Sequence, residues 1–314
     1  MKKLLFISGM ALFAAILITG CASKPAASTS TKTESKKREI YLSSDGFSKN
    51  LIEIATVPTD EKDSAFAKAS SDEPVDVMAF YFAQSEITYS RWYEVYTWAV
   101  NNGYKFANPG REGNAGTDGA APTGSNLPVT MISWRDAVVW CNAASEKDGL
   151  GPVYKYNGAV LKEADNAKEG DGKAENALIS PNANGYRLPA EAEWEFAARG
   201  ADPASDAWKN LYGLSNASSD DVAWYSGNSD GKTHDVMTKA ANGFGVYDMN
   251  GNVWEWCYDA WSTNNNRRIM RGGSYRKDAA GISVASRDSA PVTKKYDDVG
   301  FRVVKNALSQ RDAK

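Results

Sequence analysis

The stretch with the clearest chemical potential is 242–257, NGFGVYDMNGNVWEWC. Glycine, Asn and Asp crowd its first half, which is typical of a tightly coiled loop. The oxygen-bearing side chains are Asp248, Asn250, Asn252 and Glu255. Hard oxygen ligands of this kind suit calcium, although Val253 stands where an EF-hand would need its turn glycine. Two hypotheses stay open: a calcium-binding loop, or a turn stabilised by its own Asn and Asp side chains.

In the second half of this stretch, successive side chains alternate between two faces. Trp254 and Trp256 share one face, whereas Glu255 and Cys257 share the other. Such a period of two predicts a strand that carries both indoles into a core. The same alternation turns Glu255 back toward the oxygen-rich loop.

Other chemistry is scarce. His234 is the only histidine, so a Ser-His-Asp triad, a multi-histidine metal centre or a Cys-His dyad would each depend on that one residue. The net charge of −3 gives no electrostatic footprint for nucleic acid. With 314 residues, the chain can bury one large core.

The first 20 residues predict a secretory signal peptide, because two lysines precede a short apolar run. The sequence Ile18-Thr19-Gly20-Cys21 resembles the cleavage site of bacterial lipoproteins, whose cysteine is acylated. That resemblance implies a lipid on Cys21 and a membrane anchor in the bacterial envelope, at the surface of the outer membrane. The alternative is an ordinary signal peptide with a chance cysteine. Residues 21–38, rich in Ala, Ser, Thr and Lys, predict a flexible tether.

Two cysteines remain for the folded part, Cys141 and Cys257. Export permits a disulfide between them. Each also sits beside a tryptophan in an apolar segment, which suits two separately buried thiols. Both possibilities stay open.

The elements that must position these residues are short. Residues 39–76 form an N-terminal extension with possible strands at 39–42 and 51–54, and 77–82 predicts a buried strand. A helix capped by Thr88 or Ser90 is expected next, ending before Gly103. The segment 153–156 reads as one arm of a hairpin.

Two further helices carry clear end signals. Ser133, with Asp136 three residues later, is a capping-box variant before an apolar face. Pro189 can open a helix that Gly200 ends. Its glutamates, Glu191, Glu193 and Glu195, could act in acid–base chemistry, but at helical spacing they are more often partners of the helix dipole or of nearby arginines.

Four motifs together resemble the formylglycine-generating-enzyme (sulfatase-modifying factor) family. They are RLPAEAEWEFAARG at 187–200, the stretch 245–256, RGGSY at 271–275 and GFR at 300–302. The resemblance spans about 77–304, leaving 305–314 as a tail. It implies an α+β, C-type-lectin-like fold with little regular secondary structure. It also implies a structural calcium held by the side chains of Asp248 and Glu255 and the carbonyls of Gly251 and Val253.

Enzymes of this family bind copper(I) through two cysteines, five residues apart, shortly after the RGGSY-like motif. The corresponding positions here are Lys277 and Ile282, and neither side chain can ligate copper. The scaffold is therefore expected without its chemistry: no copper, and no enzyme activity.

The segment of about 275–299 replaces that chemistry with interleaved apolar and polar residues, as a recognition surface on a rigid scaffold would. The overall pattern resembles variable proteins that are diversified by retroelements. By position, the recognition residues would be Arg276, Lys277, Asp278, Ala280, Gly281, Ser286, Asp288, Ser289, Tyr296 and Asp297. The alternative is an ordinary solvated loop.

Three functions follow from these observations. The first is a surface-displayed lipoprotein that binds a protein or glycan ligand outside the cell. The second is an oxidase of the formylglycine-generating type or a related enzyme on the same scaffold. The third is a structural envelope lipoprotein with one fixed partner.

Overall fold

A computed structural model describes the ranges 51–54, 65–67, 74–77, 79–167, 172–180, 182–201, 206–263 and 266–307. The expectations for the signal peptide, Cys21, the tether and the strand at 39–42 lie outside these residues, as does most of the tail. None of the helices within the described ranges is long and apolar enough to cross a membrane.

Most ends of the three main helices are those that their sequences predict. α1 (Tyr89–Val100) is capped by the Thr88 side chain, and α2 (Trp134–Lys147) by a complete Ser133 capping box. α3 (Glu191–Arg199) ends at Gly200, which adopts a left-handed φ of 60°. Pro189 does not open α3 directly, because Ala190 is the N-cap. Three shorter helices follow: η2 (Asp206–Lys209), α4 (Ser219–Val222) and η3 (Ala279–Ile282).

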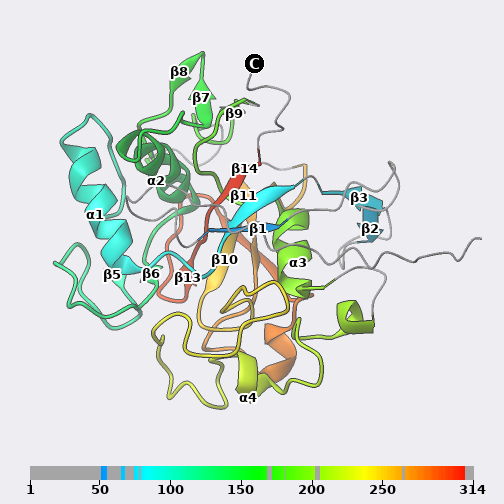
Figure 1. Cartoon of the computed structure of the whole chain (residues 1–314). Coiled ribbons are helices and arrows are strands. Elements are labelled where there is room, and N and C mark those ends of the chain that lie inside the picture. The colour runs from blue at the N-terminus through cyan, green and yellow to red at the C-terminus, as the bar shows by residue number, and fades with distance from the viewer. Residues whose placement is uncertain are drawn as a thin grey trace, which may run out of the picture. The chain divides into compact units, whose positions relative to one another are not determined.

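The C-terminal part of the chain forms a four-stranded sheet, which includes β10 (Trp254–Ala260), β11 (Arg267–Arg271) and β13 (Val299–Gly300) in Figure 1. Its order is β12 (Arg287–Pro291), β11, β10 and β13. The pairing of β10 with β13 is parallel, and the other two pairings are antiparallel. β10 is thus hydrogen-bonded on both sides, with α3 packed against it.

A second sheet joins the two ends of the fold. Its order is β1 (Leu51–Ile54), β4 (Phe80–Ala83) and β14 (Val304–Asn306), all antiparallel neighbours. The first strand of the sheet therefore precedes the domain start expected at Val77, because β1 pairs with β4 along its whole length. The buried strand expected from 77 begins only at Phe80.

The remaining strands form small sheets. β2 (Ala65–Ala67) pairs with β3 (Pro74–Asp76), and β5 (Arg111–Glu112) pairs with β6 (Val129–Thr130). β7 (Tyr154–Tyr156) lies between β8 (Ala159–Val160) and β9 (Leu178–Ile179), which confirms the hairpin arm expected at 153–156. Short helices, short strands and long connections together confirm the expected α+β class with little regular secondary structure.

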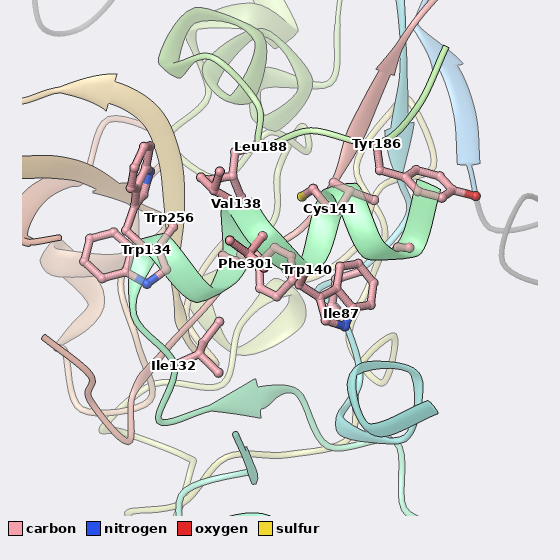
Figure 2. Close-up of a cluster of buried hydrophobic side chains, with 14 of the residues drawn as sticks. Ile87, Ile132, Trp134, Val138, Trp140, Cys141, Tyr186, Leu188, Trp256 and Phe301 are labelled. Carbon is pink, nitrogen blue, oxygen red and sulfur yellow. The ribbon is translucent and has the colours of Figure 1, made fainter. Parts of the chain in front are cut away.

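The described residues form three hydrophobic clusters, and β10 contributes side chains to the two larger ones. Trp254 and Trp256 join a cluster with α2 and Phe301, whereas Cys257 joins a second cluster with α3. Figure 2 shows the first cluster, in which Trp134, Trp140 and Cys141 project from α2. The predicted alternation is confirmed, with both faces of β10 buried. The two cysteines are free and lie in different clusters, so the question of a disulfide resolves to separate buried thiols.

Candidate ligand-binding site

Buried ion pairs hold the C-terminal half of the fold together. We call them the ion-pair frame, made of Glu191, Glu195, Glu255, Arg271 and Arg302. Arg271 Nη2 lies 2.6 Å from Glu195 Oε2, and both side chains are buried. Glu191 sits beside Arg287, with 2.5 Å between Oε1 and Nε. The glutamates of α3 are therefore anchors for arginines, as their helical spacing suggested.

The second part of the frame links the two motifs around Glu255 and Arg302. Arg302 Nε and Nη2 each lie 2.6 Å from a Glu255 oxygen, and Trp194 Nε1 donates to Oε2 at 2.7 Å. Arg302 also donates to the carbonyls of Ala83 and Tyr247. Charge-assisted bonds from one planar guanidinium thus connect β10, β4 and the loop before β10.

Arg302 faces more negative charge than it can neutralise. Glu86, Asp248 and Glu255 are all buried around it. Burial, together with the neighbouring Asp248 and Glu255, raises the pKa of Glu86 well above its usual value. Burial likewise raises the pKa of Asp248 to about 6. Three carboxylates against one guanidinium leave a deficit of two positive charges when all are ionised.

That deficit bears on the expected calcium. Hard oxygen donors suit a divalent cation, and within the described residues Asp248 Oδ2 accepts a hydrogen bond from Met237 N alone. Both oxygens of Glu255, in contrast, already accept hydrogen bonds from Arg302. No group of three His, Cys, Asp or Glu side chains within the described residues could hold a metal. Calcium would therefore depend on Asp248, Glu255 and the carbonyls of Gly251 and Val253.

The two asparagines of this loop have other partners. Asn250 Nδ2 donates to the Ile282 carbonyl at 2.6 Å, and Asn252 Nδ2 donates to Glu86 at 2.7 Å. Asn252 Oδ1 accepts from His234 N at 3.0 Å. The asparagines therefore fix the loop to its surroundings, so part of the oxygen-rich stretch is structural whether or not a cation binds.

The expected recognition segment, 275–299, combines anchored and accessible residues. Gly273, just before it, has a φ of 81°, and Ile282 and Val284 are buried. Nine of the ten expected recognition residues are at least partly accessible: Arg276, Lys277, Asp278, Ala280, Gly281, Ser286, Asp288, Tyr296 and Asp297.

Ser289 is a correction to that set. Its side chain is buried in β12, and its hydroxyl accepts a hydrogen bond from Arg267 Nε at 3.0 Å. Asp278 also has a structural role, because its carboxylate caps η3 by accepting from Gly281 N at 3.0 Å. Polarity alone suggested a free surface at both positions, whereas strand and turn geometry assign them partners.

Four of the expected residues meet at one concave site of about 220 Å³, which we call the tryptophan hollow. It is lined by Trp254, Met270, Lys277, Asp288, Ser289, Ala290, Tyr296, Asp298 and Val299. Lys277 Nζ lies 5.6 Å from the centroid of the Trp254 ring. Sequence reasoning assigned Trp254 wholly to the core and did not single out Met270 or Asp298. The pairing of β10 with β13 brings Trp254 beside Val299 and could be found only in three dimensions.

The chemistry around the hollow suits binding. Asp298 accepts a hydrogen bond from the Ser274 hydroxyl at 2.9 Å, and burial raises the pKa of its carboxyl. Asp288 is exposed. Apolar floor residues under a few charged and aromatic groups are typical of small ligand sites.

The residues expected at the family's copper positions, Lys277 and Ile282, offer no ligand that suits copper. Lys277 is an ammonium on the rim of the hollow, and Ile282 is buried in η3. Burial raises the pKa of both cysteine thiols, Cys141 and Cys257, which keeps them protonated. Neither thiol lines the hollow.

Known proteins share this architecture. Residues 43–307 match the model of the sulfatase-modifying factor enzyme 1-like domain. The chain is similar to the chaperone protein LppX of Paenibacillus barcinonensis, at 30% identity over 75% of this chain and 83% of that protein. Among solved structures, CarF matches with a TM-score of 0.65 and 30% identity, over 76% of this chain and 90% of the other.

The expected resemblance to variable proteins is also supported. Treponema denticola variable protein 1 matches with a TM-score of 0.62 and 27% identity, over 81% of this chain and 94% of that chain.

The similar proteins include both an active enzyme and a protein named as inactive. The formylglycine-generating enzyme of Mus musculus is 24% identical over 63% of this chain and 49% of the enzyme. The inactive C-alpha-formylglycine-generating enzyme 2 of Bos taurus is 31% identical over 39% of this chain and 45% of that protein. The matched residues cover nearly all of the fold described above, and the chain belongs to the sulfatase-modifying factor enzyme 1-like domain family.

Proposed function

We propose that this protein is a non-catalytic binding protein, which recognises a protein or glycan outside the cell through the segment 275–299. One observation carries the proposal: accessible polar residues of that segment meet at the tryptophan hollow, while buried ion pairs fix the backbone beneath them. A rigid scaffold with adaptable surface residues is the usual arrangement for recognition.

The competing function is an oxidase that converts cysteine to formylglycine. The resemblance implies that Lys277 and Ile282 replace the copper-binding cysteines, and this replacement supports the non-catalytic reading. We expect no formylglycine when the protein is incubated with copper(I), oxygen and a cysteine-containing sulfatase peptide. Mass spectrometry of the peptide measures this directly, and turnover above a no-protein control would exclude the non-catalytic proposal.

Site-specific photocrosslinking tests where the ligand binds. A photoreactive phenylalanine replaces Asp288, which is exposed on the rim of the hollow, or Asn102, which is exposed just beyond α1. Both proteins are incubated with extracts of animal-cell and bacterial surfaces and then illuminated. Adducts are expected at position 288 and not at 102. Equal yields at the two positions would show that the segment is not the binding face.

The same segment is where we propose sequence variation. Two observations support this proposal. The structure is similar to that of Treponema denticola variable protein 1, and nine of the candidate positions are at least partly accessible. Sequencing of DNA downstream of the gene provides the test. A near-copy of the 3′ end that differs at adenines, beside a reverse transcriptase gene, is expected. Its absence would favour a structural envelope lipoprotein with one fixed partner.

We further propose that Cys21 anchors the protein to a membrane. The support is the Ile18-Thr19-Gly20-Cys21 sequence after a short apolar run. Mass spectrometry of protein extracted from membranes should find an acylated N-terminal Cys21. An unmodified cysteine, or another N-terminus, would exclude the anchor without affecting the proposed binding face.

A further inference from the structure

We infer that the tryptophan hollow takes a basic side chain, arginine or lysine, from a protein partner, and that Lys277 is the internal competitor of that side chain. This inference rests on the proposed binding function and narrows it to one class of ligand. It follows from the size of the hollow, the charges on its rim and the position of Lys277.

The hollow fits one side chain better than a larger group. Its volume is about 220 Å³, and its floor consists of the nearly buried Trp254 and Met270 with Ala290 and Val299. Tyr296, on the rim, keeps 38% of its surface exposed. Apolar contacts with the floor suit the methylene stem of a long side chain, and aromatic rings attract its charged end.

The charge on the rim is negative. Asp288 and Asp298 line the hollow, and within the described part of the chain neither forms a salt bridge. Their neighbour Asp297 differs, because Arg276 Nη2 lies 2.5 Å from its carboxylate. The charges that line the hollow are therefore two carboxylates against the single ammonium of Lys277. An entering cation would meet two acceptors that no internal cation bonds.

Lys277 indicates how such a cation would lie. Its ammonium sits 5.6 Å from the centroid of the Trp254 ring and has no carboxylate partner within the described residues. The face of the indole thus already receives a cation from the protein itself. A ligand cation must displace this ammonium or approach against its charge, so removal of Lys277 should strengthen binding of a basic ligand.

The test is a titration of the full chain with N-acetyl-arginine amide, followed through the indole NMR signal of Trp254, which Trp254→Phe identifies. The matched probe is N-acetyl-citrulline amide, which has the same shape and no charge. A methyl glycoside is the third probe. Saturable shifts are expected with the arginine probe, and affinity at least about fivefold weaker with the citrulline probe, as loss of one to two charge contacts predicts.

Variants give effects of opposite sign. Asp288→Asn with Asp298→Asn keeps the shape and one acceptor oxygen on each side chain but removes both charges, and should weaken arginine binding about tenfold. Lys277→Met should strengthen it about two- to fivefold, the range of one exposed charge contact. Asp230→Asn, an exposed residue outside the hollow, makes the same charge change as one of the aspartate substitutions and should have no effect.

Each contrary outcome has a definite meaning. Equal binding of the arginine and citrulline probes, or weaker binding by Lys277→Met, overturns the basic-ligand inference. Shifts only with the glycoside would assign the hollow to a sugar and leave the proposed binding face standing. Crosslinking that does not favour position 288 overturns the binding face itself, whatever the small probes do.

Discussion

Arg271 and Arg276 are five residues apart, yet they belong to two regions with opposite demands. Arg271 is fully buried in the ion-pair frame, where Glu195 and Glu191 receive its guanidinium. The Arg276 side chain is 52% exposed and pairs with Asp297 at the surface. A buried pair costs several kcal/mol when one partner is removed, whereas an exposed pair contributes about 0–1 kcal/mol.

The comparison shows how one stretch of chain can have a rigid backbone and surface side chains that can be replaced. Residues of the frame are fixed by charge and burial, and they hold the backbone on which the surface residues stand. Surface residues contribute little to stability, so their identities can serve a ligand. The same division holds between neighbours such as Ser289, which is buried, and Asp288, which is exposed.

The largest expected effect comes from breaking the frame. Arg302→Met should lower the free energy of unfolding by about 3–5 kcal/mol, because Glu255 would be left buried without its cation. Arg276→Met, the exposed control, should change it by about 0.5 kcal/mol or less. Urea denaturation measures both.

Arg302→Met could also fail to fold. In that case the double variant Arg302→Met with Glu255→Gln should recover stability, because it removes the uncompensated charge together with its partner. A double variant no more stable than the single one would show that the bonds from Arg302 to the backbone carbonyls matter more than the ion pair.

Calcium should stabilise the region around Arg302, where the three buried carboxylates of Glu86, Asp248 and Glu255 face one guanidinium. At 100 times its dissociation constant, a bound ion would stabilise the fold by about 2.7 kcal/mol, seen as a higher melting temperature that EDTA reverses. Asp248→Ala should abolish the difference, and Asp288→Ala should preserve it. If neither calcium nor EDTA moves the melting temperature, the loop is held by its asparagine hydrogen bonds and Arg302 alone.

Two glycines offer a smaller contrast within the same region. A Cβ on Gly273 would lie 2.4 Å from the Gly281 carbonyl oxygen at a φ of 81°, so Gly273→Ala should cost about 1–3 kcal/mol. At Gly281 the nearest atom to a Cβ is Lys277 Cβ at 3.0 Å, and φ is not left-handed. Gly281→Ala should therefore cost less than about 1 kcal/mol. Equal losses of stability would place Gly281 in the framework.

The smallest effects are expected on the surface itself. Serine substitutions at Lys277, Asp288 and Tyr296 should each change stability by about 0.5 kcal/mol or less. Ser289→Ala removes a buried hydrogen bond and should cost about 0.5–1.5 kcal/mol. Thermal unfolding of all four variants compares the two classes. A surface variant that melts below Ser289→Ala would contradict the division between frame and surface.

Local signals in the sequence predicted local structure well. The caps at Thr88 and Ser133 and the terminator at Gly200 are set by side chains within a few residues, so they can be recognised without the fold. The alternation through β10 was recognisable for the same reason. Family motifs supplied the fold class, which no local pattern could have given.

Contacts between distant residues were beyond that reasoning. Glu255 and Arg302 are 47 residues apart, and neither sequence motif predicts that the two side chains form an ion pair. The hollow depends on where β10, β12 and β13 come together, so Trp254 could be assigned to a core but not to the floor of a surface site. Burial of Ser289 depends on β11, its partner strand, in the same way.

The position of β10 has a consequence for how the domain opens. It is hydrogen-bonded to β11 and β13, and its two faces contribute to the two larger hydrophobic clusters. Its first four residues, Trp254–Cys257, are buried, so their amide hydrogens should exchange only through unfolding of the whole domain. Deuterium uptake at the Trp256 amide would thus report global unfolding. The amides of residues 276–281 lie in the accessible segment, and they are expected to exchange through local fluctuations.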